Sequence, residues 1–245
     1  MLLDDVSSVA DRLDAETGAE APGDAAAVSS APRPAAAAPG PPQARHEHLA
    51  EVMALSRLLG RRRFGRAVYV GDGYPRFSPV LRGCADCVTV AAPGPLDVDD
   101  VSADLAVMIS VLHQRPDPAD QFAEIARILR PGAPAIIAAA NVLHGAGRDR
   151  YRRSPQAVTG SPAVTGSPAG GGRLGHHPET LMLQLAVSGL RVERMLSVSN
   201  LRHPVLHRIV PGSLMQAAEY AVQAPLAPAY FGPVLFFLAR KRDLA

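Results

Sequence analysis

The clearest pattern of hydrophobic and polar positions lies in residues 104–140. It opens with an apolar run over 105–111, broken only by Ser110, and closes with a second apolar run over 135–140. Runs of this length without polar alternation are typical of strands that are buried on both faces, as in a parallel sheet covered by helices. The pattern therefore predicts two buried strands.

A helix is predicted between these two strands. Asp117 and Pro118 are a capping residue followed by a proline of the kind that opens a first helical turn. The sequence Arg130-Pro131-Gly132 ends the helix. Hydrophobic residues recur on one helical face between these signals, at Phe122, Ile125 and Leu129. A strand that returns parallel through one helix is a right-handed βαβ unit, so the predicted fold class is α/β.

The same kinds of pattern predict the remaining elements. Helices are expected at 46–59, 77–81, 178–187 and 213–222. Pro79 is expected in the first turn of the second of these helices, where proline is tolerated. Strands are expected at 67–70, 87–91 and 190–198, and 234–239 is expected to be a final antiparallel strand at the edge of the sheet.

Two segments have compositions that do not suit a packed domain. Residues 1–44 become rich in alanine and proline, and the segment 145–175 contains the hexapeptide Ala-Val-Thr-Gly-Ser-Pro twice in succession. Such segments cannot bury enough apolar surface to offset the entropy lost when their backbone is ordered. We therefore expect a disordered tail at 1–44 and one domain at 45–245, with a flexible insertion at about 145–175.

Two glycines directly follow the first predicted strand, in the sequence Gly71-Asp72-Gly73. Glycine lets the backbone come close to a ligand, and the following helix offers free N–H groups. The sequence is not a dinucleotide-binding G-x-G-x-x-G motif, because its third glycine would fall on Arg76. A plain turn between a strand and a helix has the same sequence, so both interpretations stay open.

Together these motifs resemble those of class I S-adenosylmethionine-dependent methyltransferases, of the type 11 family. The motifs that carry the resemblance are Asp104, Leu112-His113, Pro116-Asp117-Pro118 and Leu129-Arg130-Pro131-Gly132, with Gly71 and Gly73 matching the family's glycine-rich first motif. The chain departs from that family where an acidic residue or a glycine is usual, at Tyr69, Pro75 and Ala133. The resemblance implies a Rossmann-like sheet, mostly parallel with an antiparallel last strand.

The largest departure from the family follows the second predicted strand. In the family this strand ends in an acidic residue that binds the cofactor's ribose, and Ala92 stands at that position here. Only residues 92–103 then precede the next strand, which is too few for a helical crossover. We therefore expect the usual third strand and its helix to be missing. Three residues of this link, Asp97, Asp99 and Asp100, either replace the lost carboxylate or are solvent-facing loop residues.

The resemblance implies methyl transfer from S-adenosylmethionine to a small-molecule acceptor. Its expected cofactor-binding residues here are Gly71, Asp72, Gly73, Ala92, Ser110 and Val111. His113 is the candidate catalytic residue, since it follows a strand at the end of the sheet where α/β folds bind ligands and titrates near neutral pH. A histidine that only packs at the strand end is the alternative. The departures from the family favour a second function, a catalytically inactive interaction or regulatory module with a protein partner.

Composition and charge bear on other classes of protein. The formal net charge of +2 gives no indication of nucleic-acid binding. The sequence has no signal-like start, no apolar run long enough to span a membrane and two cysteines, so we expect a cytoplasmic protein. Cys84 and Cys87 have the spacing of a redox dithiol or of half a zinc site. Since no second pair completes a zinc site, we expect no metal and a structural role for both.

Overall fold

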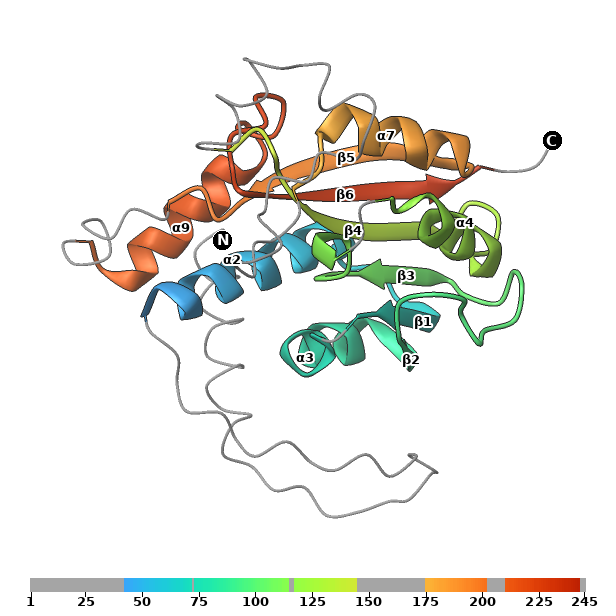
Figure 1. Cartoon of the computed structure of the whole chain (residues 1–245). Coiled ribbons are helices and arrows are strands. Elements are labelled where there is room, and N and C mark those ends of the chain that lie inside the picture. Colours follow the sequence, from blue (N-terminus) through green and yellow to red (C-terminus); the bar gives the residue numbers. More distant parts are fainter. Residues whose placement is uncertain (1–41, 72, 115–116, 145–174, 202–209, 243–245) are drawn as a thin grey trace, which may run out of the picture.

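A computed structural model describes residues 42–71, 73–114, 117–144, 175–201 and 210–242, whose arrangement Figure 1 shows. The helices are α2 (Pro42–Leu59), α3 (Tyr74–Cys84), α4 (Ala119–Ile128), α7 (Pro178–Val187) and α9 (Gly212–Gln223), with a 3₁₀ helix η1 (Leu112–Gln114). The strands are β1 (Phe64–Val70), β2 (Ala85–Ala91), β3 (Leu105–Met108), β4 (Pro134–Ala140), β5 (Leu190–Val198) and β6 (Val234–Lys241). Of the tail predicted at 1–44, residues 1–41 lie outside the described residues, and so do residues 145–174 of the insertion predicted at about 145–175.

The six strands form one mixed sheet in the order β2-β1-β3-β4-β6-β5. β2, β1, β3 and β4 are parallel neighbours, whereas β6 pairs antiparallel with both β4 and β5. The predicted α/β class and the predicted direction of the last strand are thus confirmed. The edge position predicted for that strand is wrong, because β6 lies between β4 and β5. Its apolar side chains on both faces, Leu235, Phe236 and Phe237, are almost fully buried, as expected of an interior strand.

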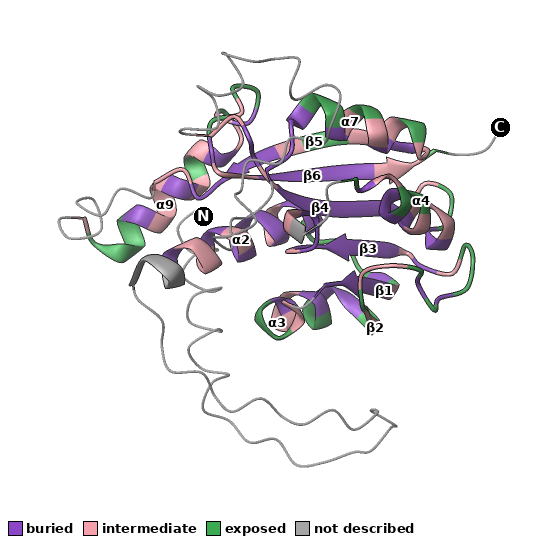
Figure 2. Cartoon of the chain, in the orientation of Figure 1, coloured by how far each residue is buried: buried purple, intermediate pink, exposed green. Residues whose placement is uncertain are grey.

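Helices cover both faces of this sheet. Side chains of α2 and α3 share one hydrophobic core with one face of the sheet, and α9 packs against its margin. Side chains of α4 and α7 share a second core with the other face. Along β1 the side chains alternate between these cores, with Ala67 and Tyr69 in the first and Val68 and Val70 in the second. Figure 2 shows the consequence, a central sheet whose strands are largely buried.

The chain passes from β2 to β3 without the third strand usual in the resembled family, as the short link predicts. This link runs back along α4, which holds it through polar side chains. Gly94 N donates to Gln121 Oε1 at 2.7 Å, and Leu96 N donates to Glu124 Oε2 at 2.8 Å. Arg127 donates to the carbonyl oxygens of Leu96 and Val98, each at 2.8 Å. A link of bends and turns, attached to α4, thus replaces a complete strand-and-helix unit.

α3 is longer than predicted and contains Pro79 beyond its first turn. A proline at this position lacks the N–H that would bond to the carbonyl of Pro75. Ser78 Oγ donates to that carbonyl oxygen at 3.2 Å and replaces the missing donor. Because this side-chain hydrogen bond takes the place of the missing backbone one, the helix continues through Pro79, which the sequence pattern restricts to a first turn.

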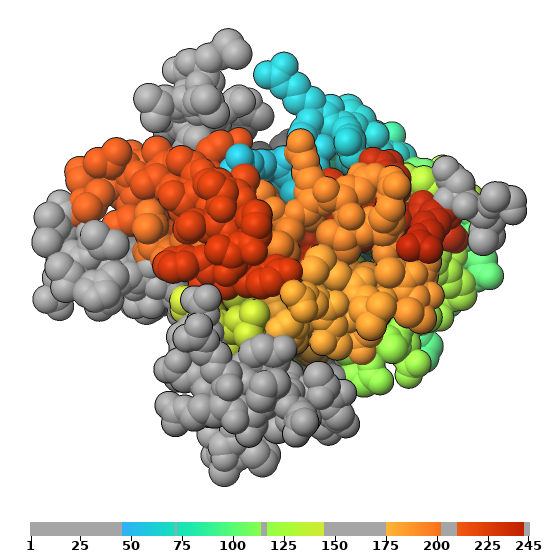
Figure 3. All heavy atoms as spheres, turned by 90° about the horizontal axis from the view of Figure 1, so that it is seen from above, coloured from blue at the N-terminus to red at the C-terminus, as the bar shows by residue number. Residues whose placement is uncertain are grey.

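α2 begins at Pro42, inside the segment predicted as a tail, and packs against α9. Arg57 donates to the carbonyl oxygen of Tyr220 at 2.7 Å, and its guanidinium carbon lies 4.4 Å from the centre of that ring. Gln223 Nε2 donates to the carbonyl oxygen of Ala50 at 3.0 Å. Figure 3 shows α9 and the segment after it (red-orange) beside α7 and β5 (light orange) on one side of the molecule. Within the described residues, no helix is long and apolar enough to cross a membrane.

Candidate functional site

A pocket opens at the carboxyl ends of β3 and β4, the end of the sheet where α/β proteins bind ligands. Its volume is about 340 Å³, including the space that is open to solvent at its mouth. α2, the segment after β3, the end of β4 and the start of β6 all contribute to its lining. The lining residues are Glu51, Ile109, Ser110, Leu112, His113, Ala138, Ala139, Ala140 and Val234.

The backbone conformation of Ser110 builds one wall of this pocket. Its φ of 63° is left-handed, which is uncommon for a residue other than glycine. β3 therefore ends at Met108, before the end of the apolar run, and the chain turns into η1. This turn places Ser110 and His113 in the pocket lining. Val111, a predicted cofactor-binding residue, is instead only 2% exposed and belongs to the core on the α4 side.

A histidine distant in sequence fixes η1 beside the pocket. Nε2 of His176 lies 2.8 Å from the carbonyl oxygen of Leu112, and His176 N donates to the carbonyl oxygen of Ala140 at 2.8 Å. His176 thereby ties the segment before α7 to the ends of both β3 and β4. The sequence pattern gave no indication of this role, because 64 positions separate His176 from Leu112.

Gly71 is required by the packing of the protein itself. It follows β1 with φ of 127°, and a Cβ atom built on it would lie 2.5 Å from the carbonyl oxygen of Ile109 and 3.0 Å from Cγ2 of Val111. Only glycine allows the end of β1 to lie this close to the end of β3. The packing accounts for this glycine without a ligand, and its role toward a cofactor stays a prediction. Asp72 lies outside the described residues.

Gly73 lies above a cluster of aromatic rings. A Cβ atom on Gly73 would lie 3.0 Å from the hydroxyl oxygen of Tyr69. The Tyr69 side chain is fully buried, with ring centres 5.5 Å from Tyr74 and 6.1 Å from Phe77. The position that is usually acidic in the resembled family is thus occupied by a buried tyrosine, which packs between β1 and α3.

His48 of α2 extends this cluster, and the pKa of its imidazole is lowered. Its ring centre lies 5.8 Å from that of Phe77 in an edge-on arrangement. Burial lowers the pKa of His48, and the nearby positive charge of Arg76 lowers it further. The imidazole of His48 is therefore held in its neutral form next to the turn that follows β1.

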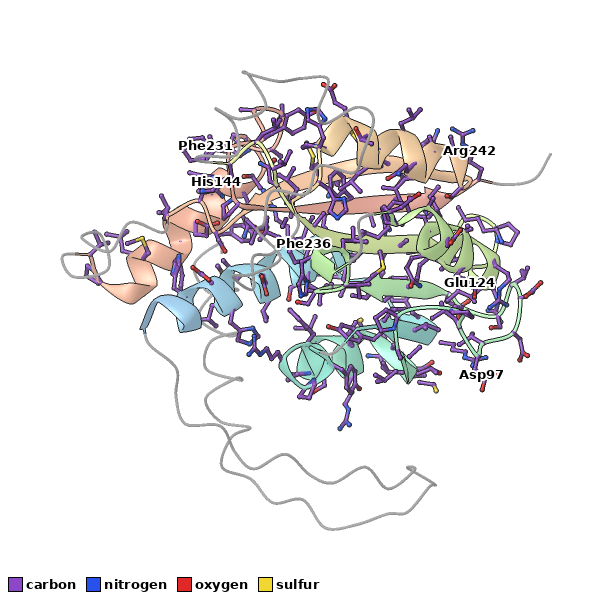
Figure 4. The ribbon with its side chains drawn as sticks, viewed as in Figure 1. Asp97, Glu124, His144, Phe231, Phe236 and Arg242 are labelled. Carbon is purple, nitrogen blue, oxygen red and sulfur yellow. The ribbon has the colours of Figure 1, made fainter. Side chains whose placement is uncertain are left out.

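Ala92 provides no carboxylate at the end of β2, and the aspartates that follow it lie far from the pocket. The link carries them to the amino end of the parallel strands, where Asp100 pairs with Arg127. Figure 4 shows Asp97 and Glu124 at one end of the sheet and His144 and Phe231, which follow β4 and precede β6, at the other. This arrangement favours the loop role for these aspartates over replacement of the lost carboxylate.

Glu51 is a pocket residue that the sequence analysis missed. The pattern of residues 46–59 predicts an amphipathic helix and assigns its charged positions to solvent. In the folded chain α2 lies against the carboxyl end of the sheet, and Glu51 lines the pocket together with Ser110 and His113. No local signal identifies this residue, since its position depends on how α2 packs on the sheet.

The two cysteines are both free thiols. Cys84 is buried at the end of α3, and burial raises its pKa, which makes the reactive thiolate less abundant. Cys87 is exposed on β2. Among the residues that the structure describes, no group of three or more His, Cys, Asp or Glu side chains is arranged to hold a metal ion.

Comparison with known proteins shows which family the chain resembles. Residues 54–137, which contain β1 to β3, the first part of β4 and part of the pocket, match the family model described as "Methyltransferase domain". The resemblance to class I S-adenosylmethionine-dependent methyltransferases is therefore confirmed. The match covers about a third of the chain. No curated protein matches the chain significantly.

Solved structures share the fold of the methyltransferase-like chain at low sequence identity. A possible histamine N-methyltransferase from Thermotoga maritima is 19% identical, with a TM-score of 0.53, and the match covers 82% of this chain and 92% of that one. An S-adenosylmethionine-dependent methyltransferase from Mesorhizobium loti is 18% identical, with a TM-score of 0.52 and coverage of 78% and 98%. The [4+2]-cyclase SpnF is 16% identical, with a TM-score of 0.51 and coverage of 80% and 82%. Because a cyclase has the same fold, the fold alone does not define the reaction.

The described residues offer S-adenosylmethionine a turn and a pocket but neither of the two carboxylates that the resembled family uses, since Tyr69 and Ala92 stand at those positions. The turn after β1 and the pocket after β3 lie side by side, since Gly71 packs against Ile109 and Val111. A ligand that spans both would contact the backbone of the turn and the Ser110 segment. Ala92, an exposed residue with no polar side chain, offers nothing to a ribose hydroxyl. This end of the sheet is therefore compatible with S-adenosylmethionine, although Ala92 provides no hydrogen bond to its ribose.

Proposed function

We propose that this protein binds S-adenosylmethionine at the carboxyl end of its sheet and catalyses transfer of the methyl group to a small-molecule acceptor. The observation that carries the proposal is the pocket at the ends of β3 and β4, which contains Ser110 and His113 beside the turn after β1. This is the ligand-binding end of an open α/β sheet. The family-model match over 54–137 supports the same activity.

In this proposal S-adenosylmethionine supplies an activated methyl group, and the protein supplies position and proton transfer. Holding an acceptor in line with a reactive group contributes most of the rate in such reactions. Ser110 and the backbone turn after β1 bind and orient the cofactor. His113 lies in the pocket lining, where its imidazole accepts a proton from the acceptor or orients it by a hydrogen bond. The apolar side chains that line the rest of the pocket limit access of water.

The missing anchors set an expectation for affinity. A hydrogen bond to a ligand hydroxyl or charge contributes about 1–3 kcal/mol when its loss leaves a polar group unpaired. Tyr69 and Ala92 occupy the family's two acidic positions. Their loss lowers cofactor affinity by roughly two to three orders of magnitude relative to a methyltransferase that has both carboxylates.

A second candidate function is a catalytically inactive interaction or regulatory module with a protein partner. The observation that favours it is the buried Tyr69, whose ring packs with Tyr74 and Phe77 below the glycine turn. Ring packing of this kind stabilises the fold and does not require a bound ligand. A protein of this kind keeps the sheet and helices but does not bind the cofactor.

Isothermal titration of the full chain with S-adenosylmethionine and S-adenosylhomocysteine separates the two candidates. The proposal expects saturable binding of both at up to millimolar concentration. The variant Ser110→Gly removes the hydroxyl while keeping a residue that tolerates positive φ, so we expect weaker binding from a folded protein. Ser102→Ala, in the link at the other end of the sheet, is the matched control and should bind as wild type does. Absence of binding by the folded wild-type chain would favour the inactive module.

A further inference from the structure

The two edges of the sheet differ in how well they are protected. β5 forms one edge, where its register with β6 shifts between Val192 and Arg194 and its charged side chains include Arg191 and Glu193. Bulges and charges are common means of keeping an edge strand from pairing with another chain. β2 forms the other edge, pairs with β1 in one register and contains neither proline nor lysine. Of these two described edges, β2 is therefore the open one.

The backbone of β2 presents a regular row of polar groups at this edge. Gly71 N, at the end of β1, donates to the carbonyl oxygen of Ala91 at 3.1 Å, so the backbone groups of Ala91 point toward β1. In a strand, the N–H and C=O groups of successive residues point to opposite sides. Those of Asp86, Val88 and Val90 therefore point away from the sheet, and among the described strands β2 pairs with β1 alone. Such a row is complementary to the backbone of a further extended strand.

The side chains of β2 also suit a further strand. Val90 is 50% exposed, and Val88 and Thr89 are half-buried. β-branched side chains of this kind are favoured where they pack against neighbouring strands. The link that replaces the usual third strand is bound to α4 and does not pair with β2. Loss of the third strand thus leaves a largely apolar strand at the edge of the sheet.

We propose that β2 pairs antiparallel with β2 of a second copy of this chain, about a two-fold axis at Val88. Val88 is the central residue of β2, and its backbone groups point outward. An axis at this residue places Val88 opposite its own copy, and Asp86 opposite Val90 of the second copy. Every outward N–H and C=O of both strands then takes part in a hydrogen bond of an antiparallel ladder.

The charge and symmetry of the edge favour a second copy as the occupant. Asp86 is the only charged residue of β2 and lies near one end of the strand. A two-fold axis at Val88 therefore holds the two Asp86 carboxylates at opposite ends of the contact, where they do not face each other. A contact of this kind closes with two copies, and the bulge and charges of β5 oppose growth from the other edge. The pairing does not involve the pocket, so it is independent of the proposed methyl transfer.

Size-exclusion chromatography with light scattering of the full chain, from micromolar to hundreds of micromolar, tests this pairing. We expect twice the mass of one chain at the higher concentrations. Val88→Pro removes an outward N–H and keeps the ladder to β1, so it should raise the dissociation constant of the dimer at least about tenfold. Val88→Lys should act in the same direction, because it places two lysines directly opposite each other. Val187→Lys, at an 82% exposed position of α7, is the control and should dimerise as wild type does.

Cysteine cross-linking tests the register of the pairing in the wild-type chain. An axis at Val88 places Cys87 opposite Thr89 of the second copy, which makes the two Cys87 residues diagonal neighbours roughly 7–8 Å apart. Cys87 is exposed, whereas Cys84 is buried. A bismaleimide with a two-carbon spacer should therefore join two chains in wild type and in Cys84→Ser, and should not join them in Cys87→Ser.

Three results would overturn the proposal. These are a folded wild-type chain that stays monomeric at hundreds of micromolar, a dimer that neither folded Val88 variant weakens, and a dimer that the bismaleimide does not join through Cys87. Circular dichroism shows whether each variant is folded. If Val88→Pro fails to fold, Val88→Lys and the cross-linking of the wild-type chain decide the outcome.

Discussion

The hydroxyl oxygen of Tyr69 lies 3.0 Å from the point where a side chain on Gly73 would begin. This contact joins the end of β1 to the start of α3, directly beside the candidate site. It shows that the glycine-rich turn is shaped by a tyrosine that replaces the family's acidic residue. The turn therefore has a structural requirement of its own, whatever ligand lies next to it.

A double-mutant cycle tests this contact. Gly73→Ala should destabilise the protein by roughly 1 kcal/mol, because the new methyl group overlaps the Tyr69 hydroxyl oxygen. Tyr69→Phe removes that oxygen, so the same alanine should cost less in the Tyr69→Phe background. Urea unfolding of the four proteins gives the coupling energy. A cost of Gly73→Ala that is equal in both backgrounds would show that the Tyr69 hydroxyl does not restrict this position.

Gly71 should tolerate no side chain. Gly71→Ala combines a strained positive φ with a Cβ atom 2.5 Å from the carbonyl oxygen of Ile109, so we expect a loss of about 2–4 kcal/mol in the free energy of unfolding. Gly83→Ala is the matched control, since it lies in α3 with nothing within 4 Å of its Cβ position and should be neutral or slightly stabilising. Similar stability of both variants would contradict the packing described for the turn. A larger residue at Gly71 would test folding rather than cofactor binding.

Arg127 should be the main anchor of the link between β2 and β3. Its guanidinium binds the carbonyl oxygens of Leu96 and Val98 and pairs with Glu124 and Asp100. Arg127→Gln should lower the free energy of unfolding by about 1–2 kcal/mol, a value reduced by the partial exposure of the side chain. Arg82→Gln, at an exposed position of α3, should change it little. Hydrogen exchange in residues 96–103 should rise in Arg127→Gln alone, and equal exchange in both variants would contradict the anchoring role.

The acid stability of the protein should depend on Glu124. Hydrogen bonds from Arg127 and then from the backbone N–H of Leu96 lower the pKa of Glu124. A carboxylate whose pKa is lowered in the folded state stabilises the fold above its unfolded pKa of 4.5, and this contribution is lost as the pH falls through the folded value. Glu124→Gln should therefore flatten the decline in unfolding free energy below about pH 5.

Glu193 supplies an independent comparison for the acid titration. Its pKa is lowered chiefly by a hydrogen bond from Arg240 on the neighbouring strand β6. Glu193→Gln should flatten a separate part of the acid decline, and the double variant should show the sum of both effects. An acid profile that neither substitution changes would show that other carboxylates control acid unfolding.

The sequence predicted the elements that depend on local pattern. The apolar runs at 105–111 and 135–140 and the helix between them are found as β3, β4 and α4, and the short link after 91 correctly predicted the missing third strand. Strand order is not a local property, so the interior place of β6 was missed. The pattern of apolar residues on both faces of 234–239 was the available signal for burial on both sides.

The candidate site was less predictable because it is assembled from distant segments. Ser110 and His113 share a lining with Glu51, which is separated from them in the chain by three strands and a helix, and only the packing of α2 brings them together. The roles of Gly71 and Gly73 were ambiguous in sequence for a physical reason. A glycine that admits a ligand and a glycine that admits a neighbouring backbone have the same spacing, and the distances to Ile109 and Tyr69 reveal the second requirement.

Hydrogen–deuterium exchange with and without S-adenosylhomocysteine tests most directly whether a cofactor binds at the carboxyl end of the sheet. The structure supplies an internal control, because residues 96–104 lie at the opposite end of the same sheet. We expect slower exchange in peptides covering 64–71 and 105–114 when the ligand is present, and no change in 96–104. No protection anywhere, or protection confined to 96–104, would contradict it.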